Sequence, residues 1–189
     1  MESLALIFYS TLVLATISVP ATNSRIIHQK NNANLIEETC KQTPHHDLCI
    51  QYLSSDPRST EADVTGLALI MVNVIKIKAN NALDKIHQLL QKNPEPSQKE
   101  PLSSCAARYK AIVEADVAQA VASLQKGDPK FAEDGANDAA IEATTCENSF
   151  SAGKSPLTNH NNAMHDVATI TAAIRMGCDM PLSCASTFF

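Results

Sequence analysis

The sequence is poor in aromatic residues and in glycine, and this bears on the fold class. Among its 189 residues there is no tryptophan, there are five glycines, and aromatic residues make up 4%. β-Sandwiches depend on β-branched and aromatic side chains and on glycine-containing turns, so this composition does not suit them. Hydrophobic residues still make up 44% and charged residues 19%, a balance typical of globular proteins. We therefore expect an all-α domain with an aliphatic interior.

The common catalytic motifs are also missing from the sequence. It contains no HExxH, no GxSxG, no P-loop and no glycine-rich dinucleotide loop. Basic residues are not in excess, because 15 Lys and Arg stand against 20 Asp and Glu, for a net charge of -5. Nucleic-acid binders carry a basic excess, so nucleic acid is not an expected partner. We expect a protein that is not an enzyme and that uses neither a cofactor nor a metal.

The amino end carries a long uncharged apolar run, from Leu4 to Ala21. This length is typical of a secretory signal peptide, and small residues suited to signal peptidase follow it. Pro20 and the polar residues after it interrupt the run short of the roughly 20 residues that a membrane-spanning helix needs. We interpret residues 1–24 as a signal peptide and 25–33 as a short linker, and expect no membrane association after cleavage. A membrane anchor is the alternative.

Six cysteines fit a secreted protein, namely Cys40, Cys49, Cys105, Cys146, Cys178 and Cys184. An even number indicates disulfides, but six cysteines allow 15 pairings and spacing alone does not decide among them. Pairing of Cys40 with Cys49 is plausible because they flank a turn at Pro44. The competing interpretation is zinc, but CxxC is absent and His45-His46 lacks the spacing of a zinc finger.

Six stretches have apolar residues at the helical spacings of three and four. Two of them are short and meet at Pro44. Together they have the length of a helical hairpin. The other four are longer and joined by short connections, which favours an up-down-up-down four-helix bundle after the hairpin. The stretches cover residues 34–43, 46–54, 60–89, 101–124, 128–150 and 156–174.

Individual residues predict where the long helices begin and which of their faces are buried. Thr60 is the expected N-cap of the first long helix, and Pro101 the expected start of the next. The stripe of that second helix runs through Tyr109, Val113 and Val117. Cys105 and Cys146 lie on the apolar stripes of neighbouring helices, so a bridge between them would staple the bundle.

The segment from Gly127 to Phe131 is the strongest candidate for a binding site. Gly127 suits a helix stop, Asp128 an N-cap and Pro129 the first residue of a helix, so an ordinary first helical turn explains them. Phe131, however, lies one position off the apolar stripe, and its helical neighbours are Gly135, Asp138, Glu142 and Thr145. An exposed aromatic residue beside the cation Lys130 suits an anchor for a partner pocket.

The same segment, GDPKFAEDG from Gly127 to Gly135, resembles the plant invertase inhibitors, which share a Pro-Lys-Phe motif. The resemblance extends over residues 35–49, 65–79 and 154–166. The parent group, shared with pectin methylesterase inhibitors, has an N-terminal helical hairpin, a four-helix bundle and two disulfides. Carried over by position, the bridges are Cys40 with Cys49 and Cys105 with Cys146. The inhibitor-like domain is then 34–177, and residues 178–189, with Cys178 and Cys184, form a tail that departs from the family pattern.

The resemblance implies a protein that inhibits acid invertase, with one inhibitor bound to one enzyme, in the cell wall (apoplast) or in the vacuole. Invertases are glycosidases that cleave sucrose with a pair of carboxylates. Pro129, Lys130 and Phe131 would then fill the sucrose-binding cleft. One alternative is a pectin methylesterase inhibitor that binds through the faces of its bundle. Another, of a different class, is a secreted helical carrier or storage protein with a ligand cavity.

Overall fold

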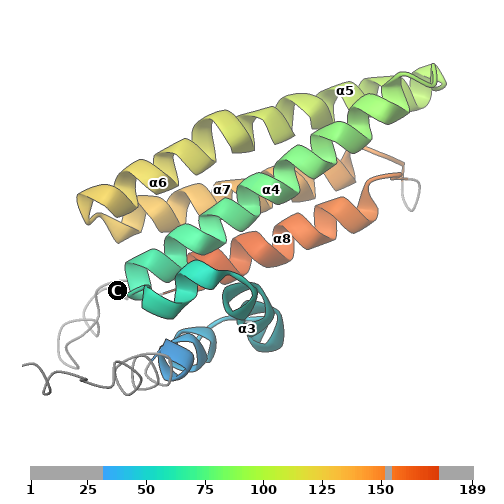
Figure 1. The fold of residues 1–189 in the computed structure, drawn as a ribbon. Coiled ribbons are helices and arrows are strands. Elements are labelled where there is room, and N and C mark those ends of the chain that lie inside the picture. Colours follow the sequence, from blue (N-terminus) through green and yellow to red (C-terminus); the bar gives the residue numbers. More distant parts are fainter. Residues whose placement is uncertain (1–31, 152–154, 175–189) are drawn as a thin grey trace, which may run out of the picture.

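The computed structural model describes residues 32–151 and 155–174, and these are helical with no strand (Figure 1). Four long antiparallel segments make up the bundle. They are α4 (Val64–Leu90), α5 (Pro96–Ala111) continued by α6 (Val117–Lys126), α7 (Pro129–Asn148) and α8 (Thr158–Ala173). The predicted all-α four-helix bundle is therefore confirmed. The expected signal peptide, residues 1–24, and the atypical tail, 178–189, lie outside the described residues.

A helical hairpin precedes the bundle, as expected. Residues 32–40 are helical, and α3 (His46–Ser55) follows after a short turn. The turn is closed by Thr43, whose hydroxyl donates a hydrogen bond to the Cys40 carbonyl at 2.8 Å. Figure 1 shows the hairpin beside the start of α4, at the end of the bundle where α6 turns into α7.

The expected N-cap of the first long helix was wrong by three residues. Asp63 is the N-cap of α4, and its Oδ1 accepts a hydrogen bond from the Gly66 amide at 2.7 Å. Thr60 lies instead in a separate 3-10 helix, η1 (Pro57–Glu61), where its hydroxyl donates to the Pro57 carbonyl at 2.9 Å. Both residues are good N-caps, and the proline at the first position of η1 favours this extra turn before α4.

The second long segment begins earlier than predicted, at Pro96 and not at Pro101. Glu95, the residue before Pro96, has φ -52° and ψ 148°, the extended conformation that proline imposes on its predecessor and that an N-cap needs. Pro96 therefore occupies the first helical position, where its missing N–H costs nothing. Pro101 is inside α5.

This segment also contains a π-helix, η2 (Ile112–Asp116), between α5 and α6. The expected stripe included Val113, but the buried residue is Ile112, and Val113 is only partly buried. From Ile112 the next buried residue is Val117, five positions on, and the π-helix accommodates this spacing because its hydrogen bonds span five residues.

The core is aliphatic and rich in alanine where α7 packs against its neighbours. Ala132, Ala136, Ala139 and Ala143 are buried on one face of α7. α4 is long and apolar enough to span a membrane by length and composition, but a buried core helix passes the same test. Its residues from Leu67 to Ile86 include nine that are buried in the bundle, so we assign α4 to the core of the domain.

Candidate functional site

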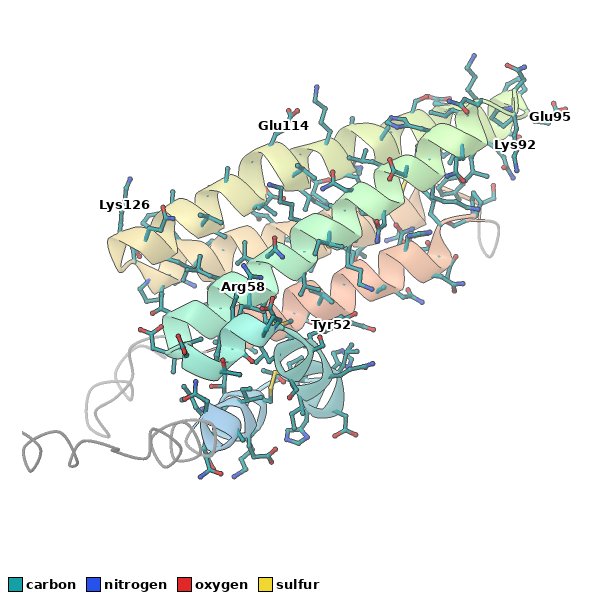
Figure 2. All side chains as sticks on the ribbon, viewed as in Figure 1. Tyr52, Arg58, Lys92, Glu95, Glu114 and Lys126 are labelled. Carbon is teal, nitrogen blue, oxygen red and sulfur yellow. A yellow bond between two sulfur atoms is a disulfide. The ribbon has the colours of Figure 1, made fainter. Side chains whose placement is uncertain are left out.

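The turn between α6 and α7 has a fixed backbone. Gly127 has φ 75°, the left-handed conformation that glycine adopts without strain. Its amide donates to the Leu124 carbonyl at 3.2 Å, and the Asp128 amide donates to the Ser123 carbonyl at 2.9 Å. These two hydrogen bonds make a Schellman motif, which ends α6 at Lys126. Figure 2 labels Lys126 at this end of the bundle.

The three predicted site residues follow this turn directly. Pro129 is the first residue of α7, and Asp128 precedes it at the N-cap position but makes no capping hydrogen bond with its side chain. The Phe131 side chain is among the large hydrophobic ones that are exposed, with 54% of its surface accessible. Its backbone carbonyl accepts a hydrogen bond from Gln119 Nε2 of α6 at 3.4 Å. Pro129, Lys130 and Phe131 thus lie together at the tip of the bundle, and the aromatic ring is open to a partner.

Lys130 is not a free cation in this structure. Its Nζ lies 3.2 Å from Glu133 Oε1 and 3.3 Å from Asp134 Oδ1. The hydrogen bond to Glu133, followed by that to Asp134, raises the pKa of Lys130 above its ordinary value. The sequence reasoning missed these two acids, although their spacing of three and four residues from Lys130 is the signal for contact on a helix.

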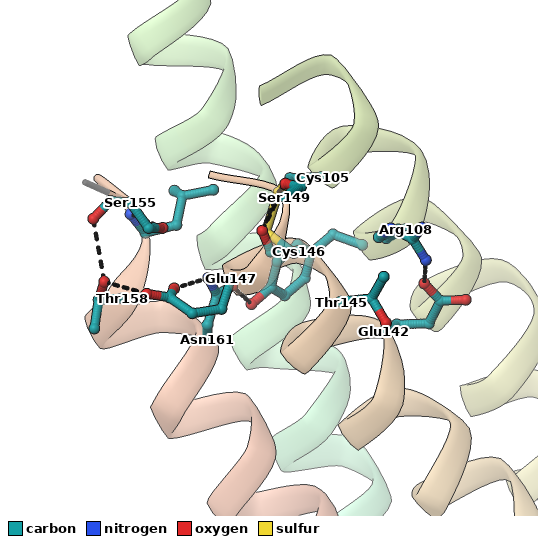
Figure 3. Close-up of a disulfide and its surroundings, with 12 residues drawn as sticks. Cys105, Arg108, Glu142, Thr145, Cys146, Glu147, Ser149, Ser155, Thr158 and Asn161 are labelled. Atoms are coloured by element: carbon teal, nitrogen blue, oxygen red, sulfur yellow. Dashed lines mark hydrogen bonds and ion pairs between the residues drawn. A yellow bond between two sulfur atoms is a disulfide. The ribbon is translucent and has the colours of Figure 1, made fainter. Parts of the chain in front are cut away.

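A second group of charges lies farther along α7, where it faces α5 and η2. Arg108 Nη1 donates to Glu142 Oε2 at 2.7 Å (Figure 3). Asp116, the last residue of η2, is partly buried, and its Oδ2 atom has no hydrogen-bond partner. Burial, with Asp138 and Glu142 close by, raises the pKa of Asp116 to about 6.

A buried polar network joins α5, α7 and α8 near the far end of the bundle (Figure 3). The Tyr109 hydroxyl donates to Asn161 Oδ1 at 2.8 Å, and Asn161 in turn donates to Glu147. Thr158 donates to the other Glu147 oxygen at 2.7 Å. Burial raises the pKa of Glu147, but the hydrogen bonds from Thr158, Asn161 and Ser155 outweigh it and leave the pKa lowered. The network is fully satisfied, so we assign it a structural role.

Two disulfides tie the described part of the chain together. One joins Cys40 to Cys49 within the hairpin, and the other joins Cys105 on α5 to Cys146 on α7. These are the pairs that the family resemblance implied. The four sulfur atoms are therefore engaged, and the described residues contain no group of three His, Cys, Asp or Glu side chains placed to hold a metal ion. Cys178 and Cys184 lie outside the described residues.

Comparison with known sequences gives one family for most of the chain. Residues 34–174 match the family described as plant invertase/pectin methylesterase inhibitor. The chain is 44% identical over 144 residues to cell wall / vacuolar inhibitor of fructosidase 1 of Arabidopsis thaliana, covering 76% of this chain and 69% of that protein. It is 28% identical over 152 residues to a putative invertase inhibitor of Platanus orientalis, covering 76% of this chain and 89% of that protein. The chain is also 29% identical over 144 residues to a pectinesterase inhibitor of Actinidia deliciosa, covering 76% of each protein.

Solved structures agree on the fold. A mutant form of a pectin methylesterase inhibitor from Arabidopsis superposes with a TM-score of 0.63 at 20% identity, over 71% of this chain and 91% of that one. A second structure of a pectin methylesterase inhibitor from Arabidopsis thaliana gives a TM-score of 0.55 at 17% identity, over 75% of this chain and 97% of the other. Together with the match over residues 34–174, these likenesses confirm the resemblance that the Pro-Lys-Phe segment indicated, and the chain belongs to the plant invertase/pectin methylesterase inhibitor family.

Proposed function

We propose that this protein inhibits a plant acid invertase by inserting the turn Pro129-Lys130-Phe131 into the sucrose-binding cleft of the enzyme. The relative with 44% identity is named an inhibitor of fructosidase, which supports this choice of enzyme. The observation that carries the mechanism is the exposure of Phe131, with 54% of its surface open at the tip of the bundle. Aromatic side chains are enriched at the cores of protein interfaces, where hot-spot residues fill pockets of the partner.

Each of the three residues has a distinct part in this mechanism. Phe131 replaces a sugar ring against the apolar walls of the cleft. Lys130 supplies a positive charge to the carboxylates with which a glycosidase cleaves its substrate. Pro129 and the left-handed Gly127 fix the backbone before binding, so that little conformational entropy is lost when the complex forms. No catalytic group on this chain takes part.

The test measures inhibition of a purified acid invertase near pH 5 by the mature protein and its variants. Phe131→Ala and Lys130→Ala are each expected to weaken the complex by about 2 kcal/mol or more, the range of central hot spots. Their stability is expected to change by about 0.5 kcal/mol or less, as for other surface sites. Ile141→Ala is the matched control, because Ile141 is also on α7 and 60% exposed, and this variant is expected to inhibit like the parent.

A core variant shows whether loss of inhibition reflects loss of folding. Phe150 is 8% exposed, so Phe150→Ala is expected to lower stability by about 3 to 5 kcal/mol while leaving the turn intact. If the Phe131 and Lys130 variants inhibit invertase as strongly as the parent protein, insertion of the turn is wrong.

Inhibition of pectin methylesterase is the second candidate, favoured by the pectinesterase inhibitors among the relatives. Binding through the faces of the bundle would leave Phe131 without a role. The same variants are therefore assayed against a pectin methylesterase, and strong inhibition that is insensitive to Phe131→Ala would establish this candidate in place of the first.

A secreted carrier or storage protein would need a ligand site inside the bundle. The described residues include a groove of ≈ 420 Å³ between α4 on one side and α5 and η2 on the other, whose lining includes Leu83, His87, Lys110 and Glu114. The groove is open to solvent, whereas a ligand site buries most of the surface of its ligand, so it does not favour a carrier. Analysis of small molecules extracted from the purified protein tests this option, and a tightly bound ligand in stoichiometric amount would support it.

The place of action and the stoichiometry belong to the same proposal. Residues 1–24 direct the chain into the secretory pathway, residues 25–33 link it to the inhibitor domain 34–177, and residues 178–189 form a tail. The protein then acts in the cell wall (apoplast) or vacuole and forms a 1:1 complex with the enzyme. Amino-terminal sequencing of the secreted protein and size-exclusion chromatography of the complex test these points.

A further inference from the structure

The placement of Lys130 is unfavourable for the helix on which it lies. Lys130 is the second residue of α7, where the positive end of the helix dipole repels a cation. Its two acidic partners follow it in the chain, which is also the weaker of the two orientations for ion pairs on a helix. Helix stability favours the two acids near the amino end of α7, but it does not explain the cation at position 130.

The three side chains form a small and accessible charge cluster. The Lys130 side chain is 68% exposed, and those of Glu133 and Asp134 are each 44% exposed. Nζ of Lys130 reaches both carboxylates, at 3.2 and 3.3 Å. One positive charge thus faces two negative ones, so the cluster presents a net negative charge beside Phe131.

This arrangement opposes the binding that we propose for the turn. A cleft lined by carboxylates attracts Lys130 but repels Glu133 and Asp134, and like charges brought together at an interface weaken it. The lysine must also leave its two partners before it can pair with an acid of the enzyme. Exposed ion pairs of this kind are weak, so the lysine can exchange partners when the complex forms.

We propose that Glu133 and Asp134 act as a clamp on Lys130 that lowers the affinity of the turn for a carboxylate-lined enzyme cleft. This inference rests on the function proposed above and adds two residues that set its strength. Neutralising the clamp releases Lys130 and strengthens inhibition. The two acids are therefore regulators of affinity and do not themselves anchor the partner.

The test compares inhibition constants for acid invertase near pH 5 at low ionic strength. The double variant Glu133→Gln/Asp134→Asn keeps the shape of both side chains and is expected to inhibit roughly five- to tenfold more strongly than the parent. The gain is expected to shrink when salt is added, because exposed charges are screened. Asp84→Asn/Glu114→Gln is the control, since it changes the net charge equally at exposed acids on α4 and η2. We expect it to leave inhibition within twofold of the parent.

A third set of variants tests whether the gain depends on the lysine. Lys130→Met is combined with Glu133→Gln/Asp134→Asn, and the gain is expected to shrink, because there is no cation to release and only the relief of repulsion between the two acids and the cleft remains. Unchanged or weaker inhibition by the double variant overturns the clamp, and so does an equal gain in the Lys130→Met background.

Phe131→Ala is measured in the same series to separate the two proposals. If it inhibits like the parent, the proposed function fails; if it loses inhibition while the double variant gains none, only the clamp fails.

Discussion

Gly135 on α7 lies directly against the backbone of Asp116. A Cβ atom placed on residue 135 would stand 2.8 Å from the Asp116 carbonyl oxygen and 3.5 Å from Ala120 Cβ. Asp116 ends the π-helix η2, so α7 makes its close approach at the point where the opposite helix departs from α-helical geometry. The absence of a side chain at Gly135 therefore lets α7 pack against η2.

Gly135→Ala is expected to destabilise the protein by up to about 2 kcal/mol. Alanine favours a helix over glycine by about 1 kcal/mol, but overpacking against an immovable backbone oxygen costs about 1 to 3 kcal/mol. Urea unfolding measures the difference. Asn137→Ala, two residues on and exposed, is the control and is expected to be neutral or slightly stabilising. A Gly135→Ala variant more stable than the parent by about 1 kcal/mol, the full helix-propensity gain, would contradict the close approach.

The two disulfides are expected to contribute unequally to stability. The bridge from Cys105 to Cys146 closes a sequence separation of 41, and that from Cys40 to Cys49 closes 9. The entropy of loop closure in the unfolded chain then gives about 4 kcal/mol for the first and about 2.5 kcal/mol for the second. Paired Cys→Ala variants at each bridge, compared by urea unfolding, measure the two values. Peptide mapping without reduction must find these same pairs, and a different main connectivity would contradict the structure.

Tyr109→Phe is expected to cost about 1 to 3 kcal/mol of stability, although it removes one oxygen atom only. The substitution leaves Asn161 Oδ1 buried without the donor that now lies 2.8 Å away. Thermal unfolding at pH 7 provides the measurement. Tyr52→Phe is a suitable comparison, because Tyr52 is only partly buried and contacts Lys78 through its ring. Equal stability of the two variants would mean that the Tyr109 hydroxyl bond contributes nothing.

The sequence predicted the parts of the fold that rest on local chemistry. Gly127, Asp128 and Pro129 are residue types with strong positional preferences, and all three occupy the expected places. The exposure of Phe131 followed from its position relative to the alanine stripe of α7. Helical periodicity was sufficient to predict which face of α7 is buried, because a small shift in register would have buried a charged residue in place of an alanine.

Other features depend on contacts that a sequence does not contain. Thr60 and Asp63 are both good N-caps, and only the packing of η1 before α4 decides between them. Ile112 and Val113 are both apolar, so the insertion of a π-helix between α5 and α6 leaves no signal in the pattern. The contacts of Lys130 with Glu133 and Asp134 are of a different kind, because the spacings of three and four residues on a helix predict them.

Protonation of Asp116 is expected to raise the stability of the domain as the pH falls from about 6 to about 4. Its pKa is raised to about 6 by burial and by Asp138 and Glu142, compared with an ordinary value of 3.8. A carboxyl group with a raised pKa in the folded state destabilises the fold when it is charged. The penalty is therefore fully present only well above pH 6, and it is relieved as Asp116 binds a proton between about pH 6 and pH 4.

Asp116→Asn isolates this contribution, because the amide has the same shape and carries no charge at any pH. The variant is expected to be more stable than the parent at pH 7.5 by about 1 kcal/mol, a value reduced from the full shift because Asp116 is only partly buried. At pH 4 the two proteins are expected to unfold at nearly the same temperature.

Other titrating groups act on both proteins alike. The pKa of His46 is raised, chiefly by its hydrogen bond to Asp47, and the pKa of His160 is lowered by burial. The difference between the two melting curves removes these contributions. A difference that does not change between pH 7.5 and pH 4 would show that Asp116 does not titrate in this range.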